Sequence, residues 1–262
     1  MNSNSKKNNA YQFEFSKLYK DNMFNQTERV QKAKKTIAVI NDYLETKSAY
    51  QKGLSPNFSV LDIGCSTGYL TKYYASQFNY VIGIDIDENA IKYARTHNSG
   101  QNLKYEIGDS LNLDFPDNSI DIVICTHIYE HVPDPKQMMN QIYRVLKPGG
   151  FCYFVAGNRL VLIEPHYRLP FLSIMPKWMA NYYLRLTKNG KYYYENLLFL
   201  PDLKNIVKQF ELTDYTVQVV SNPQKFNATD MITQNSIKQK FYLFVLGIAY
   251  FCCPSFIWIL KK

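Results

Sequence analysis

The segment 60–68, Val-Leu-Asp-Ile-Gly-Cys-Ser-Thr-Gly, constrains the fold of this chain more than any other feature. Its apolar residues predict a buried strand, and the small residues that follow predict a tight turn before a helix over 69–77. Gly64 and Gly68 let the backbone approach a ligand that a Cβ would push away. The spacing differs from G-x-G-x-x-G, in which a helix N-terminus faces a pyrophosphate. An acid before the first glycine, Asp62, favours a ligand with an amino-acid end and no phosphate.

Further apolar runs follow in the order that an open parallel sheet requires, and two are followed by acids. The runs span 80–85, 103–107, 120–125 and 151–156. Asp85 ends the first of these runs, 21 residues after Gly64. In open parallel sheets an acid at this place binds ribose hydroxyls. Asp109 follows the next run, where a carboxylate beside a loop can contact an adenine amino group. Separated by helical segments, these runs predict an α/β fold.

With these motifs, residues 1–157 resemble the class I S-adenosylmethionine-dependent methyltransferases, most closely the type 11 and quinone-biosynthesis branch. The matching motifs are Leu-Asp-Ile-Gly-Cys-Ser-Thr-Gly, Gly-Ile-Asp-Ile-Asp, Gly-Asp-Ser with Phe-Pro-Asp-Asn-Ser, Glu-His-Val-Pro-Asp and Val-Leu-Lys-Pro-Gly-Gly. The commonest family pattern has glycine where this chain has Ser66. The resemblance implies a Rossmann-like seven-stranded mostly parallel sheet with an antiparallel last strand, helices on both faces and an aromatic cap insertion.

The resemblance also implies S-adenosyl-L-methionine as the cofactor. The implied cofactor-binding residues are Asp62, Gly64, Cys65, Ser66, Gly68, Asp85, Ile86, Asp109, Ser110 and Thr126. A non-catalytic binding module would keep the fold but lose these contacts, and the intact acids and glycines argue against it. A nicotinamide-dependent oxidoreductase would require G-x-G-x-x-G, which this chain lacks.

The loop after the run 120–125 is where the family places its acceptor chemistry. His127, Glu130 and His131 resemble a Glu-x-x-Glu-His cluster by which some quinone-pathway and RNA 2′-O-methyltransferases hold a divalent metal. A fourth ligand would come from Glu164 or His166. Many relatives carry Glu-His-Val-Pro here with no known metal, so we expect none in this chain.

We expect instead that one of two histidines, His131 or His166, is a catalytic base, because imidazole titrates near neutral pH. A hydroxyl acceptor must lose a proton during methyl transfer, whereas a carbanion acceptor arrives activated by conjugation. A histidine base therefore favours O-methylation over C-methylation.

Residues 158–200 lie where relatives insert an acceptor-binding cap, and they are rich in Trp, Tyr, Met, Leu and Arg. One interpretation is an amphipathic surface that enters a lipid interface. The other is a closed cap whose aromatic residues surround a small substrate. A looser resemblance to enzymes of cell-surface glycan and lipid biosynthesis favours a lipid, quinone or lipid-linked glycan acceptor, and a small soluble aromatic acceptor is the alternative.

The C-terminal stretch 241–260 carries no charge and has about the length needed to cross a bilayer. A methyltransferase sheet, however, needs a sixth strand, expected at 211–220, and an antiparallel seventh, which only 255–261 can supply. Pro254 would separate that strand from an apolar helix over 238–251. We therefore expect a helix and a strand here, with the helix in the membrane interface rather than across the bilayer.

The net charge of +8 is spread along the chain, and its basic residues never form a dense block with aromatic residues between them. We therefore expect no nucleic-acid partner. Attraction to an anionic membrane surface is consistent with this charge. The five cysteines form no C-x-x-C pair, which argues against disulfides and structural zinc. The N-terminus lacks the apolar core of a signal peptide, so we expect a cytoplasmic protein with peripheral contact at the cytoplasmic membrane face.

The chain divides into an N-terminal part and a catalytic part. Residues 1–50 are expected to form a polar tail and a helical lid region, in which the aromatic stretch 11–19 either covers the cofactor, as the corresponding segment of related enzymes does, or packs into the core. Residues 51–262 form the methyltransferase domain, which contains the cap 158–200 and the helix and strand of 238–262. The sequence gives no indication of the oligomeric state.

Overall fold

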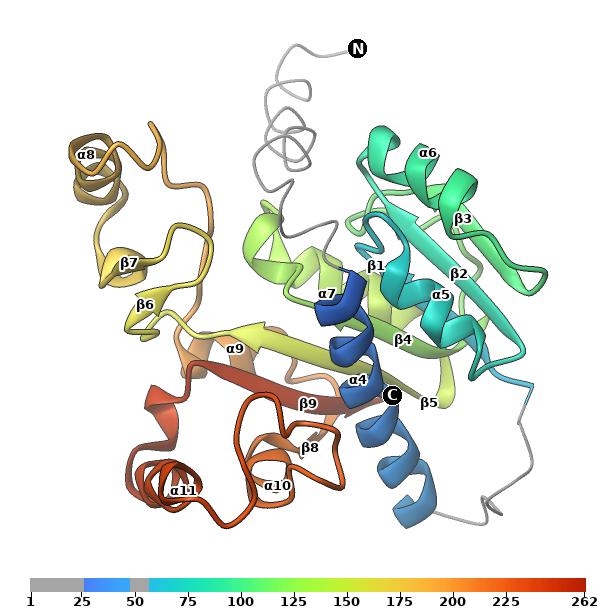
Figure 1. Ribbon diagram of the computed structural model, residues 1–262. Coiled ribbons are helices and arrows are strands. Elements are labelled where there is room, and N and C mark those ends of the chain that lie inside the picture. Colours follow the sequence, from blue (N-terminus) through green and yellow to red (C-terminus); the bar gives the residue numbers. More distant parts are fainter. Residues whose placement is uncertain (1–25, 48–56) are drawn as a thin grey trace.

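The computed structural model describes residues 26–47 and 57–262, and the expected lid stretch 11–19 lies outside them. A seven-stranded sheet has the order β3-β2-β1-β4-β5-β9-β8 (Figure 1). The strands are β1 (Ser59–Ile63), β2 (Tyr80–Asp85), β3 (Leu103–Ile107), β4 (Ile120–Thr126), β5 (Leu146–Gly157), β8 (Glu211–Asp214) and β9 (Ser255–Lys261). Only β9 runs antiparallel to its neighbours, β5 and β8. The predicted fold class is confirmed.

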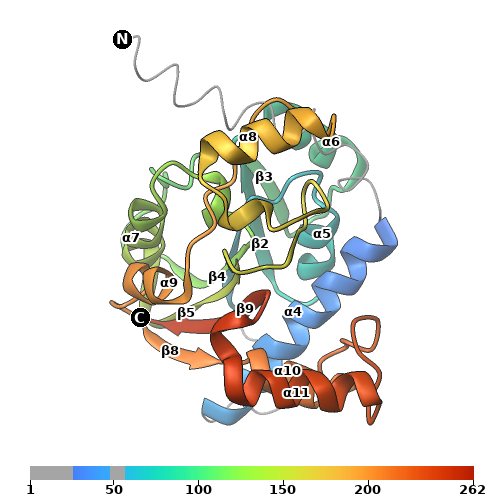
Figure 2. The same cartoon turned by 90° about the vertical axis from the view of Figure 1, so that its left-hand side faces the viewer.

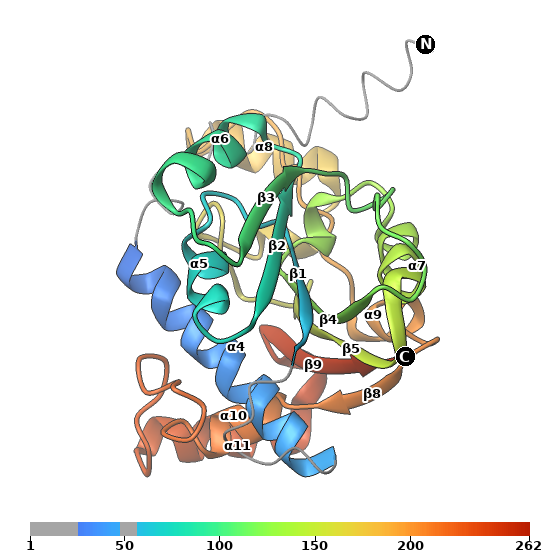
Figure 3. The ribbon, with the colours of Figure 1, turned by 90° about the vertical axis from the view of Figure 1, so that its right-hand side faces the viewer.

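Helices cover both faces of this sheet, because successive residues of each strand face opposite sides. On one face, α4 (Gln26–Lys47), α5 (Tyr69–Ala75) and α10 (Thr216–Ser221) pack against residues such as Val60 and Ile122. On the other, α7 (Pro135–Val145) and α9 (Leu200–Ile206) pack against Leu61 and Val123. Figure 3 shows these two layers, with α6 (Glu88–His97) beside α5. Ala33, Ile37 and Ile40, spaced four and three residues apart, are buried on one face of α4.

The parallel register aligns the carboxyl ends of the central strands. Ile63 at the end of β1 pairs with Ile84 of β2 and with Cys125 of β4. Asp85 in turn pairs with Ile107 at the end of β3. The loops that follow these four strands therefore start at one edge of the sheet, which is where ligands bind in open α/β folds.

The C-terminal stretch folds as a helix followed by a strand, as expected. Helix α11 (Ile237–Ala249) and a short 3-10 turn (Tyr250–Cys252) precede β9, with Pro254 between them. Ser236 caps α11, because its side chain accepts a hydrogen bond from the backbone N–H of Gln239. None of the helices in the described part of the chain is long and apolar enough to cross a membrane.

The expected sixth strand is shorter than predicted. Strand β8 ends at Asp214, and 216–221 form helix α10 instead of continuing to Val220. The Asp214 carboxylate accepts a hydrogen bond from the backbone N–H of Thr216 at 2.8 Å, which turns the chain away from the sheet. Tyr215 and Val219 then bury their side chains beneath the sheet.

The cap, residues 158–200, has a small core of its own. It contains a hairpin of β6 (Ile163–Glu164) and β7 (Leu169–Pro170), a 3-10 turn (Leu172–Ile174) and helix α8 (Lys177–Leu186). Leu172, Ala180 and Leu184 are buried inside it with Tyr193. Trp178, by contrast, is 72% exposed. The cap is thus closed within and apolar outside, so it combines features of both interpretations of the sequence.

Candidate active site

The turn after β1 needs both of its glycines. Gly64 and Gly68 have φ values of 74° and 83°, in the left-handed region that favours glycine. A Cβ on Gly64 would lie 2.1 Å from Cδ1 of Ile128, and one on Gly68 would lie 2.5 Å from the Tyr105 hydroxyl. The backbone N–H groups of Gly64 and Cys65 both donate to the Ile84 carbonyl, at 2.8 and 3.0 Å, which fastens the turn to β2.

Asp85 is joined to this turn by hydrogen bonds. Its Oδ2 accepts from the Ser66 backbone N–H at 2.8 Å, and its Oδ1 accepts from the Asp87 N–H at 2.9 Å. A carboxylate can accept about four hydrogen bonds, so Asp85 keeps capacity for a ligand hydroxyl. The Ser66 Oγ, beside it, is buried without a hydrogen-bond partner among the described residues. Both groups fit a polar ligand at this edge.

Asp62 lies deeper, at 5% exposure, and its Oδ2 accepts a hydrogen bond from the Thr71 hydroxyl at 2.7 Å. Burial raises the pKa of Asp62 to about 7. Arg29, in the first turns of α4, interacts electrostatically with both Asp62 and Asp85, although burial lowers its own pKa. The sequence did not point to Arg29, because no motif surrounds it and only the path of α4 brings it here. The Asp62 carboxyl group and the Arg29 guanidinium together fit the zwitterionic end of an amino-acid ligand.

The other predicted cofactor residues lie at the ends of the same strands, with one difference in orientation. Asp109 follows β3, and its Oδ1 accepts from the Leu111 N–H at 2.9 Å. Ser110 is buried next to it, and Thr126 ends β4. Ile86 follows Asp85 directly and is half-buried. Cys65 instead packs its side chain into a small core of α6 and β3 residues, so only its backbone faces the edge.

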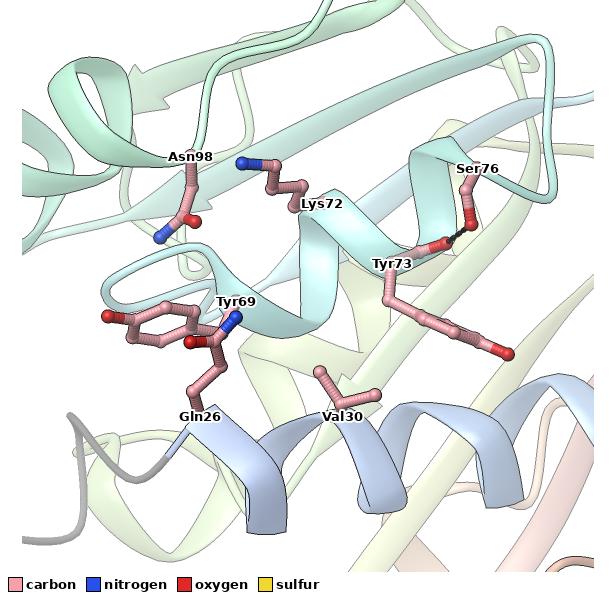
Figure 4. A pocket seen from close by; sticks show the side chains of 7 residues that line it. All are labelled: Gln26, Val30, Tyr69, Lys72, Tyr73, Ser76 and Asn98. Carbon is pink, nitrogen blue, oxygen red and sulfur yellow. Dashed lines mark hydrogen bonds between the residues drawn. The ribbon is translucent and has the colours of Figure 1, made fainter.

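A separate cavity of about 240 Å³ lies between α4 and α5 (Figure 4). Its walls include Gln26 and Val30 of α4, Tyr69 and Tyr73 of α5, and Asn98 after α6. None of the predicted cofactor residues lines it. The cavity is therefore distinct from the carboxyl edge of the sheet.

The cap brings His166 to His131. His131 ends a 3-10 turn (Tyr129–His131) after β4, and the centroids of the two imidazole rings lie 5.0 Å apart. Glu164 holds His166 in place, because its buried carboxylate accepts from His166 Nδ1 at 2.7 Å and from the backbone N–H groups of His166 and Tyr167 at 2.8 Å each. The residues singled out from sequence thus meet in space, although 35 positions separate them.

The two histidines differ in charge. Burial lowers the pKa of His131 to about 4. Burial also opposes a charge on His166, but the hydrogen bond and charge of Glu164, with the charges of Glu195 and Glu130, together raise its pKa. At neutral pH His131 is therefore a neutral imidazole with a free acceptor, although its lowered pKa makes it a weaker base than the free imidazole on which the sequence-based expectation rested. The neighbouring ring of His166 holds its proton more firmly.

A carboxylate that sequence reasoning missed completes this group. One oxygen of Glu195, which is 2% exposed, lies with a ring nitrogen of His131 and one of His166, all within 4.8 Å of one another. These three residues could share a divalent cation. This group differs from the set expected from sequence, which combined His131 with His127 and Glu130. In the structure those two residues contact each other, since the Glu130 carboxylate accepts from His127 Nδ1 at 3.1 Å. The expectation that no metal binds stays a prediction.

Comparisons with known proteins agree with the architecture. A family model described as a methyltransferase domain, of type 11, matches residues 61–154. The chain is 39% identical over 105 residues to a ubiquinone biosynthesis O-methyltransferase of Idiomarina loihiensis, across 39% of this chain and 43% of that protein. It is 31% identical over 169 residues to the protein of the same name from Thiobacillus denitrificans, across 63% of this chain and 68% of the relative. The first of these matches thus spans less than half of the relative's length.

Solved structures show the same fold. An S-adenosylmethionine-dependent methyltransferase from Mesorhizobium loti matches 84% of this chain and 96% of its own, with a TM-score of 0.51. The two sequences are 14% identical, so this likeness concerns the fold alone.

Proposed function

This chain belongs to the class I S-adenosylmethionine-dependent methyltransferases, and we propose that it transfers a methyl group to a hydroxyl oxygen of a membrane-associated acceptor. The observation that carries the proposal is the neutral His131 beside His166, at the carboxyl edge of the sheet and beneath the cap. A hydroxyl acceptor requires a group that takes its proton, and a neutral imidazole at this place supplies one.

The residues of the carboxyl edge fit S-adenosyl-L-methionine, whose sulfonium supplies an activated methyl group. Asp85 would bind the ribose hydroxyls, and Asp62 would face the amino group of the methionine end. Asp109 would contact the adenine amino group, and the glycine turn would let the backbone come close. The buried Ser66 Oγ, which has no hydrogen-bond partner within 26–47 and 57–262, supports a polar ligand here.

The work left to the protein is positioning and proton removal. Holding the acceptor oxygen in line with the methyl group removes much of the entropic cost of the reaction. The ring of His131 would accept the hydroxyl proton as the oxygen attacks. His166, anchored by Glu164, would keep its own proton and orient the acceptor.

Ionisation of Asp62 makes the predicted cofactor affinity depend on pH. The carboxylate attracts an amino group only when ionised, and its ionised fraction grows as the pH rises through about 7. We expect the affinity for S-adenosylmethionine to rise about eightfold between about pH 6 and pH 7.5. Calorimetry across this range measures it, with Asp62→Asn as the variant that should bind equally at each pH. A flat profile for the native chain would contradict the assignment of Asp62.

Two exposed apolar surfaces support a membrane-associated acceptor. They belong to α8 and α11, which lie on the same side of the molecule, the side that faces the viewer in Figure 2. The most exposed side chains are Trp178, Tyr182 and Leu186 of α8 and Ile237, Phe241, Phe244 and Ile248 of α11. Lys238 and Lys240 on α11 add positive charge. Apolar insertion and basic attraction are the two signals that stable peripheral binding requires.

We expect the protein to sediment with vesicles that contain an anionic phospholipid and to be released by carbonate washing. Replacing Phe244 and Ile248 together by Ser should lower the bound fraction at least about fivefold, because two apolar anchors are lost. Tyr80→Ser is the matched control, since Tyr80 is 44% exposed at the start of β2 and away from both helices. Binding of the double variant at the native level would contradict membrane contact through α11.

Methyl transfer itself is tested with the purified protein and S-adenosylmethionine that carries a deuterated methyl group. Lipid extracts and aqueous metabolite extracts are incubated separately and compared by mass spectrometry. We expect a lipid-extractable product in which one trideuteromethyl group has replaced a hydrogen. Fragmentation of that product in the mass spectrometer should show the label on an oxygen atom. A product confined to the aqueous extract would favour a small soluble aromatic acceptor, which the closed core of the cap supports. No product in either extract would contradict the proposal.

A further inference from the structure

A second cavity, of about 310 Å³, lies inside the cap next to the histidines. Leu197 lines it and lies against the end of β5, since a Cβ on Gly157 would come within 2.9 Å of Leu197 Cδ2 and 3.7 Å of Glu130 Oε1. Glu195 belongs both to the cavity wall and to the group that contains His131 and His166. Glu195 therefore connects the cavity wall to the two histidines.

One wall of the cavity carries a guanidinium with unused donors. Arg159 follows β5, is half-buried, and donates through Nε to the Ser173 carbonyl at 3.2 Å. Its guanidinium also lies over the Phe199 ring, 5.1 Å from the centroid. Within 26–47 and 57–262, no carboxylate forms a salt bridge with it, and no hydrogen bond involves its two terminal nitrogens. The fork of an arginine fits a carboxylate or a phosphate through two parallel hydrogen bonds.

A neighbouring cation adds to the positive potential of this wall. Lys177 Nζ donates to the backbone carbonyls of Tyr193 and Tyr194, at 3.1 and 3.0 Å, and to that of Glu195. These bonds use its three donors, so Lys177 fixes the backbone of the wall. Its pKa is lowered to about 8, mainly by burial, with the charge of Glu195 opposing this shift and the charge of Arg159 adding to it. Two cations thus share the cavity with one carboxylate, and a bound anion would balance the excess positive charge.

A buried hydroxyl independently indicates a ligand. Tyr193 lines the cavity at 5% exposure, and its hydroxyl has no hydrogen-bond partner among the residues described. Most buried polar side chains are hydrogen-bonded, so this donor is positioned for a group that the protein itself does not provide. Met175, Leu197 and Leu198 supply apolar wall around it.

We propose that this cavity binds the methyl acceptor through an anionic group, a carboxylate or a phosphate, which pairs with Arg159 while the Tyr193 hydroxyl donates to the same molecule. The acceptor is thus an acidic compound with an apolar body. This inference rests on the proposed function, because it places the methyl acceptor in the cap.

The test is calorimetric titration of the full chain, loaded with S-adenosylhomocysteine, with three phenolic or phenyl probes. 4-Hydroxybenzoate carries a carboxylate, phenyl phosphate carries a phosphate, and 4-hydroxybenzyl alcohol is neutral. We expect at least one anionic probe to bind about tenfold more tightly than the neutral one. The tighter of the two anions identifies the acidic group of the acceptor.

Variants assign that preference to the cavity. Arg159→Gln should abolish the preference for the anion, and Arg159→Lys should restore part of it. Arg185→Gln is the matched control, because Arg185 is exposed on α8 and its removal changes the net charge equally. Equal affinities for all probes, absence of anion binding, or an anion preference retained by Arg159→Gln would overturn the inference. Binding of S-adenosylhomocysteine is measured first. A chain that binds it without preferring an anionic probe contradicts this inference alone, whereas a chain that does not bind it contradicts the proposed function.

Discussion

Replacement of His131 by Ala is expected to lower the rate of methyl transfer about a hundredfold, while the affinity for S-adenosylmethionine stays nearly unchanged. His131 is neutral because burial lowers its pKa to about 4, and it faces the cap, where the acceptor is proposed to bind. Its loss would remove the group that takes the hydroxyl proton but no predicted contact to the cofactor. Steady-state turnover and calorimetry on the same preparations measure the two effects.

His97→Ala is the matched control for this prediction, because His97 is exposed at the end of α6, away from the cap. It should leave turnover at the native level. Turnover of His131→Ala within about twofold of the native value would contradict a catalytic base at this position. Activity that EDTA abolishes and Mg²⁺ or Zn²⁺ restores would instead assign His131, His166 and Glu195 to a metal.

Replacement of Asp85 by Ala is expected to weaken the binding of S-adenosylmethionine at least about tenfold, or about 1.4 kcal/mol. A carboxylate that accepts hydrogen bonds from two ribose hydroxyls forms charge-assisted bonds, which are stronger than neutral ones. The backbone N–H groups of Ser66 and Asp87 hold this carboxylate at the end of β2. Calorimetric titration with the cofactor provides the measurement.

Asp85→Asn separates the charge from the shape of the side chain, since the amide can still accept from the Ser66 N–H. It should bind more weakly than the native chain but more tightly than Asp85→Ala. Asp114→Ala, at an exposed loop position, is the control and should bind normally. An unchanged affinity in a folded Asp85→Ala protein would remove the assignment of the cofactor site.

Much of the fold is predictable from the sequence because each strand carries its own signal. The run 80–85 ends in Asp85, the run 103–107 is followed by Gly108 and Asp109, and Pro254 marks where an apolar helix must give way to β9. The end of β8 is not predictable from propensity, because Thr216, Val217 and Val219 favour a strand as much as the residues before them. The hydrogen bond from the Thr216 N–H to Asp214 decides it.

The candidate site likewise contains some residues that sequence motifs locate and others that only the three-dimensional path of the chain brings there. Asp62 and Asp85 lie in the last residues of β1 and β2, and Asp109 follows β3; the parallel order of these strands places them at one edge, so local motifs locate them. Arg29 and Glu195 have no motif, and they reach the site only through the path of α4 and of the cap. Tyr193 is one aromatic residue among many in the cap, and only its buried, unpartnered hydroxyl distinguishes it.

The most direct test of the central assignment is a crystal structure of the chain with S-adenosylhomocysteine. We predict the ribose hydroxyls within hydrogen-bond distance of Asp85, the amino group facing Asp62, and the sulfur directed toward the cap and His131. S-Adenosylhomocysteine bound elsewhere, for example in the cavity between α4 and α5 (Figure 4), would contradict it.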